Sequence, residues 1–556
     1  MTHRKRRDAE IAPEEIFIDT QSSFDRGRFE GRLERPLSRR TYVALFLALI
    51  AGLSILALRA ADLEIVQGAA LAAESAHNSL AQTAVFAPRG IITDYQGVVL
   101  AGNTETADGT LRRDFPYPEL GSVLGYVSYP KKDASGNYYD TAEKGVAGLE
   151  AAFDQMLRGE NGSVLVETDA AGAVRSEGSI VPAVPGATLA LSLDASLERA
   201  LASAVAATAR RVGFVAGAGV ILDVHTGAVR AIVSYPSYDP SVMSDGGPGA
   251  AIASYESDPG HPFLDHAIGG VYTPGSIVKP FIAAGALTDG VITPATVIND
   301  NARLTVPDPY HPGQEFVYTG WKALGPVDVR QAIAWSSDVF FYTVGGGYQG
   351  IKGLGIDRLD YWYKAFGLGA PSGLGLAGEA SGLIPSPAWK QKALGEPWYL
   401  GDTYHTAIGQ YSMQVTPIQM ARATAAIANG GTLVTPTLLA GAKPVSTKVP
   451  VDPAALAVVR EGMRAGVTSA LAKALDLPTL AVAAKTGTAQ VGASNQYDNS
   501  WVEGFYPYDN PQYAFAVVLE RGPSGAGEEA VNAMRAFFDA LQSGLATTTA
   551  SSTLAH

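Results

Sequence analysis

The feature that most constrains this chain is an uncharged apolar run near its N-terminus, from Thr41 to Leu58. As an α-helix these residues extend about 27 Å, close to the thickness of the hydrocarbon core of a bilayer. Six arginines lie between residues 26 and 40, whereas only Arg59 lies between residues 59 and 88. By the positive-inside rule, we predict a cytoplasmic tail at 1–40, a single transmembrane helix at 41–59 and an extracytoplasmic remainder. A buried soluble helix is one alternative; a cleaved signal peptide is disfavoured by the long leader and the lack of a clear cleavage site.

The composition excludes several classes of function. The net charge of −13 disfavours nucleic acid as a partner. The chain has no cysteine, which rules out disulfides, cysteine-bound zinc and thiol catalysis. Its eight histidines are scattered without close ligand spacing. His311 lies near Asp300 and Asp308 in the sequence, but a solvated loop histidine is a better interpretation than a metal ligand.

The region at 60–190 has the pattern of a mixed α and β domain. We expect a helix at 60–85, then a hairpin at 88–101 that turns at Tyr95-Gln96-Gly97. A second helix is expected within 145–162. Prolines and glycine at 182–186 then indicate a linker.

A second, larger domain is expected at 191–543, followed by a disordered tail at 544–556. An amphipathic helix at 193–212 opens it, and two strands follow at 219–234 around His225-Thr226-Gly227. Further expected elements are helices at 332–344 and 528–541 and strands at 480–485, 501–505 and 513–520.

The first chemical signal is Ser276 followed three residues later by Lys279. Pro274 and Gly275 precede them, so a helix that begins near Ser276 places both side chains on one face. The helix N-terminus and the apolar residues after Lys279 both disfavour the ammonium form and should lower the pKa of this lysine. A neutral Lys279 could then activate Ser276 for acyl transfer.

Two partner motifs follow in order. Ser336-Ser337-Asp338 comes first, and Lys485-Thr486-Gly487-Thr488 comes later. Lys-Thr-Gly occurs once, against an expectation on the order of 0.1 for a chain of this length. This ordered trio is typical of penicillin-binding proteins and class A β-lactamases. Singly, each match could be a helix cap, a polar loop or a strand with a glycine.

On these residues the chain resembles the monofunctional class B penicillin-binding proteins over nearly its whole length. PRGIITDYQGVVLA at 88–101 is similar to the opening signature of their non-catalytic pedestal domain. Further similar stretches lie at 145–162, 223–227, 235–240, 375–385 and 407–431. Asp338, followed after Val339 by Phe340-Phe341-Tyr342, is similar to the elongation branch, penicillin-binding protein 2. The chain departs from the family pattern at the Tyr95-Gln96 turn and at Tyr411.

The resemblance implies an α+β fold. A single N-terminal transmembrane helix would carry an elongated mixed pedestal (dimerisation) domain. A transpeptidase domain with a central antiparallel sheet flanked by helices would follow. No glycosyltransferase region precedes the pedestal, which disfavours the bifunctional class A type.

The resemblance also implies the activity, a peptidoglycan D,D-transpeptidase that forms a serine acyl-enzyme. Ser276 would attack the D-Ala-D-Ala carbonyl with Lys279 as base, and Ser336 would relay a proton to the departing D-Ala. Lys485 completes the implied catalytic set. No metal or cofactor is required. A β-lactamase-like hydrolase, a division-type transpeptidase and an inactive penicillin-binding scaffold or sensor are the alternatives.

The implied substrate-binding residues lie at Asp338 and on the expected strand at 485–488. Asp338 would bond the stem-peptide amide, while Thr486, Gly487 and Thr488 would line the extended peptide. Backbone N–H groups of Ser276 and Thr488 would form the oxyanion hole. The implied partners are stem peptides, β-lactam antibiotics and a membrane-embedded glycan polymerase, with the catalytic domain outside the inner membrane.

Overall fold

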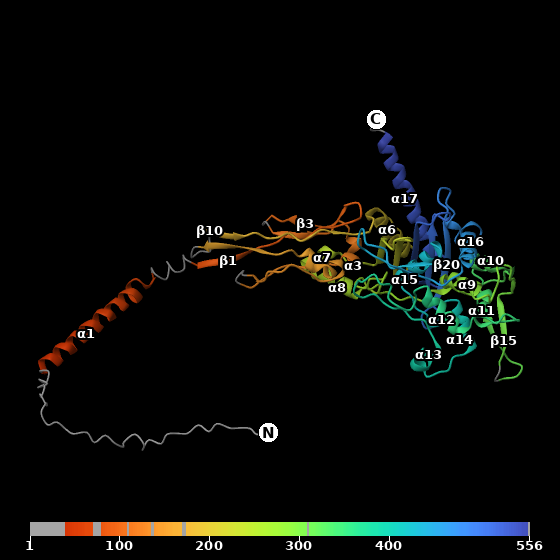
Figure 1. Ribbon diagram of the computed structural model, residues 1–556, viewed down its shortest axis with the longest axis horizontal. Helices are drawn as coiled ribbons and strands as arrows, with labels where there is room; N and C mark the ends of the chain where they lie inside the picture. Colours follow the sequence, from red (N-terminus) through yellow and green to blue (C-terminus); the bar gives the residue numbers. More distant parts are fainter. Residues whose placement is uncertain are drawn as a thin grey trace, which may run out of the picture. The chain divides into compact units, whose positions relative to one another are not determined.

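The computed structural model describes residues 39–69, 79–107, 110–134, 138–168, 174–308 and 311–553 (Figure 1). The chain divides into two compact units. The first contains residues 1–81 and 166–177, and the second contains residues 82–165 and 178–556.

The first unit contains the apolar helix α1 (Arg39–Ala61), which continues into a π-helical turn, η2 (Asp62–Val66). Together they form a 28-residue helix that is long and apolar enough to cross a membrane, and none of the α1 side chains is buried. This agrees with the span predicted at 41–59.

The helix predicted at 60–85 is wrong at its end, because Ser79–Val85 forms strand β1. Residues 70–78 lie outside the described part. Strand β1 joins β9 (Gly162–Thr168) and β10 (Val174–Val181) in a three-stranded sheet.

The pedestal part of the second unit is built on a small sheet in the order β11-β2-β3-β4. The predicted hairpin is confirmed as β2 (Ile92–Thr93) and β3 (Val99–Glu105). Its turn is closed by the Asp94 side chain, which accepts hydrogen bonds from the backbone N–H groups of Gln96 and Val98. The remaining elements are β4 (Leu111–Asp114), η3 (Pro118–Leu120), α3 (Gly121–Leu124), β5 (Val127–Ser128), β6 (Lys131–Lys132), β7 (Tyr138–Asp140), β8 (Lys144–Gly145), α4 (Gly148–Ala152), α5 (Asp154–Leu157) and β11 (Leu189–Ala190).

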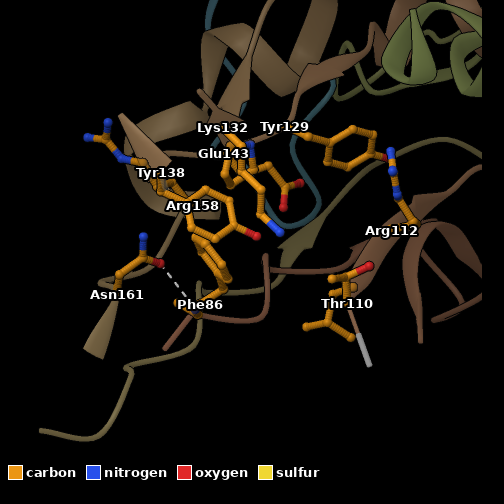
Figure 2. A pocket seen from close by; sticks show the side chains of 12 residues that line it. Phe86, Thr110, Arg112, Tyr129, Lys132, Tyr138, Glu143, Arg158 and Asn161 are labelled. Atoms are coloured by element: carbon orange, nitrogen blue, oxygen red, sulfur yellow. Dashed lines mark hydrogen bonds between the residues drawn. The ribbon is translucent and has the colours of Figure 1, made fainter. Parts of the chain in front are cut away.

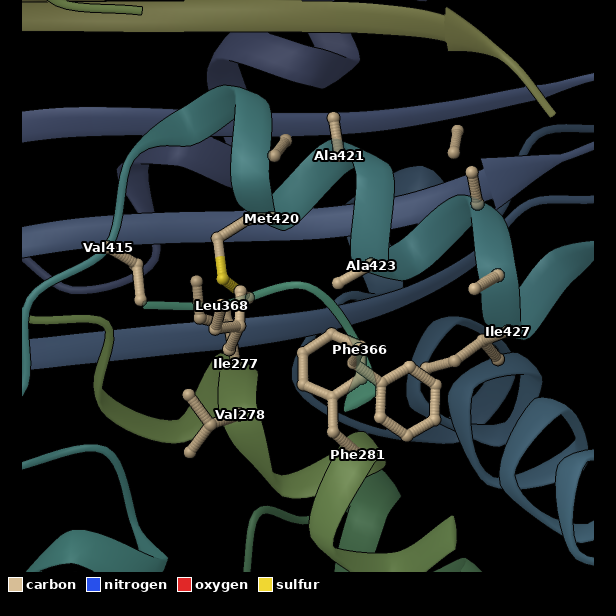
Figure 3. Close-up of a cluster of buried hydrophobic side chains, with 14 of the residues drawn as sticks. Ile277, Val278, Phe281, Phe366, Leu368, Val415, Met420, Ala421, Ala423 and Ile427 are labelled. Carbon is tan, nitrogen blue, oxygen red and sulfur yellow. The ribbon is translucent and has the colours of Figure 1, made fainter. Parts of the chain in front are cut away.

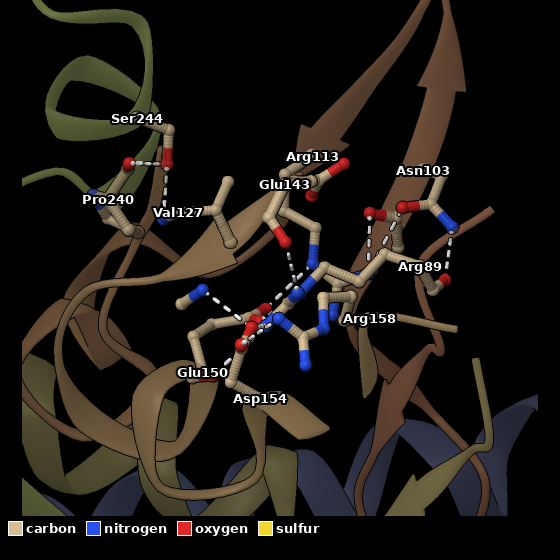
Figure 4. Close-up of polar contacts among 12 residues, drawn as sticks. Arg89, Asn103, Arg113, Val127, Glu143, Glu150, Asp154, Arg158, Pro240 and Ser244 are labelled. Atoms are coloured by element: carbon tan, nitrogen blue, oxygen red, sulfur yellow. Dashed lines mark hydrogen bonds and ion pairs between the residues drawn. The ribbon is translucent and has the colours of Figure 1, made fainter. Parts of the chain in front are cut away.

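The pedestal contains a buried ionic cluster centred on Glu150 (Figure 4). The Glu150 carboxylate accepts Nε–H of Arg89 at 2.6 Å and Nε–H of Arg113 at 2.7 Å. All three side chains are almost fully buried. Arg89 also reaches Asp154 at 2.9 Å. Because Arg89, Arg113 and Glu150 come from three separate segments, the cluster fixes the strands against α4 and α5. The predicted single helix at 145–162 is these two short helices instead.

The larger part of the second unit is organised around a five-stranded antiparallel sheet in the order β13-β12-β22-β21-β20. The strands predicted at 219–234 are confirmed as β12 (Ala216–Asp223) and β13 (Val229–Tyr235). The strands predicted at 501–505 and 513–520 are confirmed as β21 (Tyr497–Tyr506) and β22 (Tyr513–Pro523). The strand predicted at 480–485 is confirmed only from residue 483, where β20 (Ala483–Val491) begins. β20 is the end strand of this order.

Helices cover both faces of the sheet. α6 (Ala195–Val212) and α17 (Glu529–Thr553) pack on one face, where Ile221 and Val517 point toward them. α15 (Pro417–Ala428) packs on the other face, which receives Val220 and Val518. This alternation follows the two-residue period of a strand, and it explains why the central strands are apolar on both sides.

Beneath α15 lies the turn that carries Ser276. This turn is the 3₁₀ helix η4 (Gly275–Val278), and it continues into α9 (Lys279–Thr288). Ile277, Val278 and Phe281 enter a fully buried apolar cluster that also contains Phe366 and Met420 (Figure 3). The turn is therefore anchored by its apolar side chains.

The remaining elements of this part are α7 (Pro240–Asp245), α8 (Gly249–Ser257), β14 (Ile298–Asp300), β15 (Arg303–Pro307), β16 (Glu315–Thr319), β17 (Gly325–Val327), α10 (Val329–Ala334), α11 (Asp338–Gly346), α12 (Gly355–Ala365), α13 (Pro387–Leu394), α14 (Leu400–Ala407), β18 (Thr432–Val434), β19 (Ser446–Lys448), α16 (Pro453–Ser469) and η5 (Lys473–Leu475).

Two further predictions need correction. The helix expected at 332–344 is broken into α10 and α11, because Ser336 has a φ of +58° and leaves the helical conformation. The Ser337 side chain then caps α11 by accepting from Phe340 N–H. The disordered tail expected at 544–556 is also wrong up to Thr553, because α17 continues to that residue.

The buried cluster predicts a large effect for removing its carboxylate. Glu150→Gln leaves two buried guanidinium groups without the carboxylate that both contact, and breaking a buried ion pair in this way costs about 3–5 kcal/mol. Asp245→Asn removes the exposed partner of Arg112 and should cost less than about 1 kcal/mol. Hydrogen exchange of the amides at 89–157, measured on the full chain in detergent, reports the loss of stability in each of the two variants. Equal protection in the two variants would contradict this role of Glu150.

Candidate active site

Ser276 is placed by a close approach of the η4 turn to strand β20. Gly275 has a φ of +58°, and a Cβ there would lie 2.8 Å from the backbone oxygen of Thr488. A Cβ on Gly487 would lie 2.9 Å from Ile277 and from the backbone oxygen of Pro274. Both positions therefore require glycine. Ser276 remains partly exposed and faces the cleft beside the strand.

Lys279 is fully buried, and its ammonium group is held by the second motif. Its Nζ donates to the Ser336 backbone oxygen at 2.8 Å, to Ser336 Oγ at 3.2 Å and to Asp338 Oδ1 at 2.7 Å. None of these hydrogen bonds goes to Ser276. Burial lowers the pKa of Lys279, while the Asp338 carboxylate opposes that shift.

Ser336 reaches this position through an unusual backbone conformation. A φ of +58° is uncommon for a residue other than glycine, and such strained residues gather at functional sites. The conformation turns the chain between α10 and α11, so that both Ser336 and Asp338 meet Lys279. Asp338, predicted to bind the substrate amide, contacts Lys279 through one oxygen. Its other oxygen accepts from Trp321 N–H at 3.3 Å.

Lys485 is buried on strand β20, and its Nζ donates to the backbone oxygen of Thr486 at 2.7 Å. Burial, together with the nearby charge of Lys279, lowers the pKa of Lys485 to about 7. Thr486, Gly487 and Thr488 line the cleft. Because the sheet order ends at β20 among the described residues, the outer edge of this strand can accept an extended peptide.

Most of these residues line a cleft of about 760 Å³, whereas Lys279 and Lys485 are buried and are not among its lining residues. Sequence reasoning identified six of the residues that line it: Ser276, Ser336, Asp338, Thr486, Gly487 and Thr488. It assigned no role to Gln410, although this residue lies in the family-like stretch at 407–431. It missed others because they lie on distant segments without a motif: Thr319, Trp321, Tyr342, His405, Asn495 and Glu528. Tyr411 also lines the cleft and was marked only as a departure from the family pattern. Its φ of +67° places it among the strained residues.

His311 is exposed and pairs with Asp308 at 2.9 Å. Across the described ranges, no group of three or more His, Cys, Asp or Glu side chains could hold a metal ion. A second cavity, of about 300 Å³, lies in the pedestal (Figure 2). Phe86, Tyr129 and Tyr138 line it together with Arg112, Lys132 and Arg158, and it contains none of the predicted site residues.

Comparisons with known proteins cover both parts of the second unit. The family model "Penicillin binding protein transpeptidase domain" matches residues 217–539, and the model "Penicillin-binding Protein dimerisation domain" matches residues 106–191. The peptidoglycan D,D-transpeptidase MrdA of Escherichia coli (strain K12) is 34% identical over 476 residues, which cover 78% of this chain and 72% of the relative.

Solved structures are also similar to this chain over most of its length. The Pseudomonas aeruginosa PBP2 structure, in complex with WCK 5153, is 33% identical with a TM-score of 0.66, and the match covers 82% of this chain and 96% of that one. A chain of the structure described as "Structural coordination of polymerization and crosslinking by a peptidoglycan synthase complex" is 30% identical with a TM-score of 0.70. That match covers 90% of this chain and 98% of the other.

The contact between Asp338 and Lys279 predicts a pH effect. If neutral Lys279 is the base, the rate of Ser276 acylation rises with pH through the pKa of this lysine. Asp338→Asn removes a charge that raises this pKa, so the rise should move to lower pH by about 1–3 units. Labelling by a fluorescent penicillin across pH measures the shift. Asp539→Asn, which removes the partner of Arg535 on the surface, is the control and should leave the profile unchanged. A profile in Asp338→Asn identical to wild type would contradict the assignment.

Proposed function

The chain belongs to the class B penicillin-binding proteins, and from this premise we propose that it cross-links peptidoglycan as a D,D-transpeptidase through an acyl-enzyme on Ser276. The observation that carries the proposal is the convergence of three distant segments. Ser276, Ser336 and Thr486–Thr488 line one cleft, and the buried Lys279 lies beneath it. We place this activity in cell elongation, because the relative MrdA and the PBP2 structure match over most of the chain.

In the first step Ser276 Oγ attacks the carbonyl of the D-Ala-D-Ala bond, and Lys279 accepts its proton. Burial favours the neutral amine that this role requires. Backbone N–H groups of Ser276 and Thr488 stabilise the oxyanion. Support comes from the close packing of the turn on β20, which sets the two residues side by side.

In the second step the departing D-Ala receives a proton through Ser336. Ser336 Oγ lies 3.2 Å from Lys279 Nζ, which allows the proton taken from Ser276 to pass along this contact. An amine from a neighbouring stem peptide then takes the acyl group. Ser336 therefore serves as a relay between the base and the leaving group.

The acyl donor binds along β20 as an added strand. Lys485 and Thr486 hold its terminal carboxylate, because a buried cation beside a hydroxyl suits a carboxylate. Gly487 allows the strand to approach the serine turn, and Thr488 lines the peptide. We assign Asp338 two tasks, a contact with Lys279 and, through its second oxygen at the cleft, a contact with the stem-peptide amide.

We also propose the domain boundaries and membrane arrangement. The pedestal comprises residues 60–190 and the transpeptidase domain residues 191–543, consistent with matches at 106–191 and 217–539. The helix at 41–59 anchors the chain in the inner membrane with residues 1–40 in the cytoplasm, because arginines concentrate before it. A membrane-embedded glycan polymerase is the proposed partner, by analogy with the synthase complex.

The acyl-enzyme predicts stable labelling by penicillin. A fluorescent penicillin should modify Ser276, and the adduct should persist for minutes or longer because no residue is assigned as a dedicated deacylating base. Peptide mapping identifies the modified residue, and Ser276→Ala should abolish labelling. Rapid turnover of penicillin would favour a β-lactamase-like hydrolase. Labelling that survives Ser276→Ala would refute the site.

Substitutions of the two lysines should impair different steps of the reaction with penicillin. Arginine stays protonated, so Lys279→Arg removes the base and should slow acylation of the bound complex by about 10²–10⁴-fold. Lys485→Arg keeps a cation and should mainly weaken capture of penicillin. Acylation kinetics over a range of penicillin concentrations separate the rate constant from the binding constant. Normal acylation in Lys279→Arg, or a pure affinity loss in both variants, would exclude Lys279 as the base.

A further inference from the structure

His266 is a buried histidine that none of the roles described so far uses, and it lies ten residues before Ser276 in the chain. Only 1% of its surface is exposed. Its ring bridges two neighbours, because Nε2 lies 2.7 Å from the backbone oxygen of Gly260 and Nδ1 lies 2.5 Å from the Tyr272 hydroxyl oxygen. Both polar atoms of the ring are therefore paired, and such a buried bridge holds its partners in a fixed geometry.

The partners of the ring determine which of its nitrogens carries the proton. A backbone carbonyl can only accept, so Nε2–H of His266 donates to Gly260. In the neutral ring Nδ1 is then an acceptor, and it receives the Tyr272 O–H. Burial lowers the pKa of His266, which favours this neutral form. His266 therefore accepts a hydrogen bond that fixes the Tyr272 side chain.

Tyr272 is closely enclosed around that hydrogen bond. Its ring packs on Trp501 of β21, with the ring centroids 6.0 Å apart. A Cβ at Gly270 would collide with the Tyr272 hydroxyl oxygen, so this position requires glycine. Glu520 is the other acceptor near the hydroxyl, and its Oε2 lies 3.8 Å from His266 Nδ1. Because Glu520 is the more exposed of the two, water competes more strongly for it than for His266.

Tyr272 leads directly into the serine turn. Its backbone N–H and oxygen both hydrogen-bond with Val415 at 2.9 Å, and Val415 belongs to the buried apolar cluster (Figure 3). Trp501 Nε1–H donates to the backbone oxygen of the next residue, Thr273, at 3.0 Å. Ser276 follows three residues later. A shift of the Tyr272 side chain would therefore displace Trp501, and with it the backbone that leads to Ser276.

We propose that His266 is a positioning residue for the acylation step, which fixes Tyr272 and thereby the backbone that carries Ser276. Ser276 supplies the attacking oxygen and one N–H of the proposed oxyanion hole, so a small displacement of the turn weakens both. His266 does not line the cleft, so its loss should affect the rate of acylation more than the binding of substrate. The inference rests on the proposed role of Ser276.

The test measures acylation by a fluorescent penicillin on the full-length chain in detergent, over a range of concentrations that separates the acylation rate constant from the binding constant. His266→Ala should lower the rate constant by about 10- to 100-fold, with little change in binding. His266→Gln should restore most of the rate, because its amide offers one donor and one acceptor to the same partners. Tyr272→Phe should slow acylation to a similar degree, and the double variant His266→Ala/Tyr272→Phe should be no slower than either single variant.

Two further variants are controls. His225→Ala removes another histidine whose Nε2 hydrogen-bonds with a backbone oxygen, that of Pro511 at 3.0 Å, and it should acylate like wild type. Glu520→Ala leaves His266 in place and should have a smaller effect than His266→Ala. The final amplitude of labelling reports the folded fraction, so a loss of folding alone lowers the amplitude and leaves the rate constant unchanged.

Four outcomes would overturn the proposal. The first is a wild-type rate constant in His266→Ala. The second is equal slowing in His266→Ala and His266→Gln, which would show that the ring itself is needed and its hydrogen bonds are not. The third is a loss confined to the binding constant. The fourth is slowing in Glu520→Ala or His225→Ala that equals the slowing in His266→Ala.

Two further results have a defined meaning. Where His266→Ala yields no labelled protein, Tyr272→Phe decides, and a wild-type rate in that variant overturns the proposal. A wild-type chain that is not labelled at Ser276 would instead overturn the proposed function, and this proposal with it.

Discussion

The close packing of the serine turn against the end strand of the sheet is the constraint on which the site depends. Gly275 and Gly487 meet where side chains would collide with backbone atoms. The apolar residues Ile277 and Phe281 hold the turn in the core from below. Because both sides of this contact are fixed, Ser276 lies beside Thr488 before any substrate arrives. Such preorganisation is what an oxyanion site requires.

A second constraint is the burial of two lysines close together. Each ammonium group loses water on burial, and the charge of Lys279 further lowers the pKa of Lys485. The Asp338 carboxylate, from a separate segment, pairs with Lys279 at 2.7 Å, whereas Lys485 Nζ donates to the backbone oxygen of Thr486. The roles that we propose for the two lysines differ, a neutral base for Lys279 and a carboxylate-binding cation for Lys485.

Several parts of the fold could be predicted because their signals are local. Asp194 caps α6 by accepting from two backbone N–H groups, and the apolar spacing that follows is helical. The strands of the central sheet were also recognisable from their apolar runs. The predictions failed where distant contacts override local preference. Residues 332–344 have a helical pattern, but Ser336 breaks the helix to reach Lys279. Residues 79–85 have helix-forming composition, yet they pair as a strand in a sheet.

The sequence by itself determined the apolar helix, the order of the three motifs and the spacing of Ser276 and Lys279, since each depends on neighbours along the chain. Only the tertiary structure decided which groups meet around the lysines. Asp338 lies 59 residues from Lys279, and its contact depends on a backbone turn at Ser336. Glu528 carries no motif, yet it lines the same cleft as Ser276. Charge interactions between buried groups depend on distance and exclusion of water, and long-range packing alone sets both.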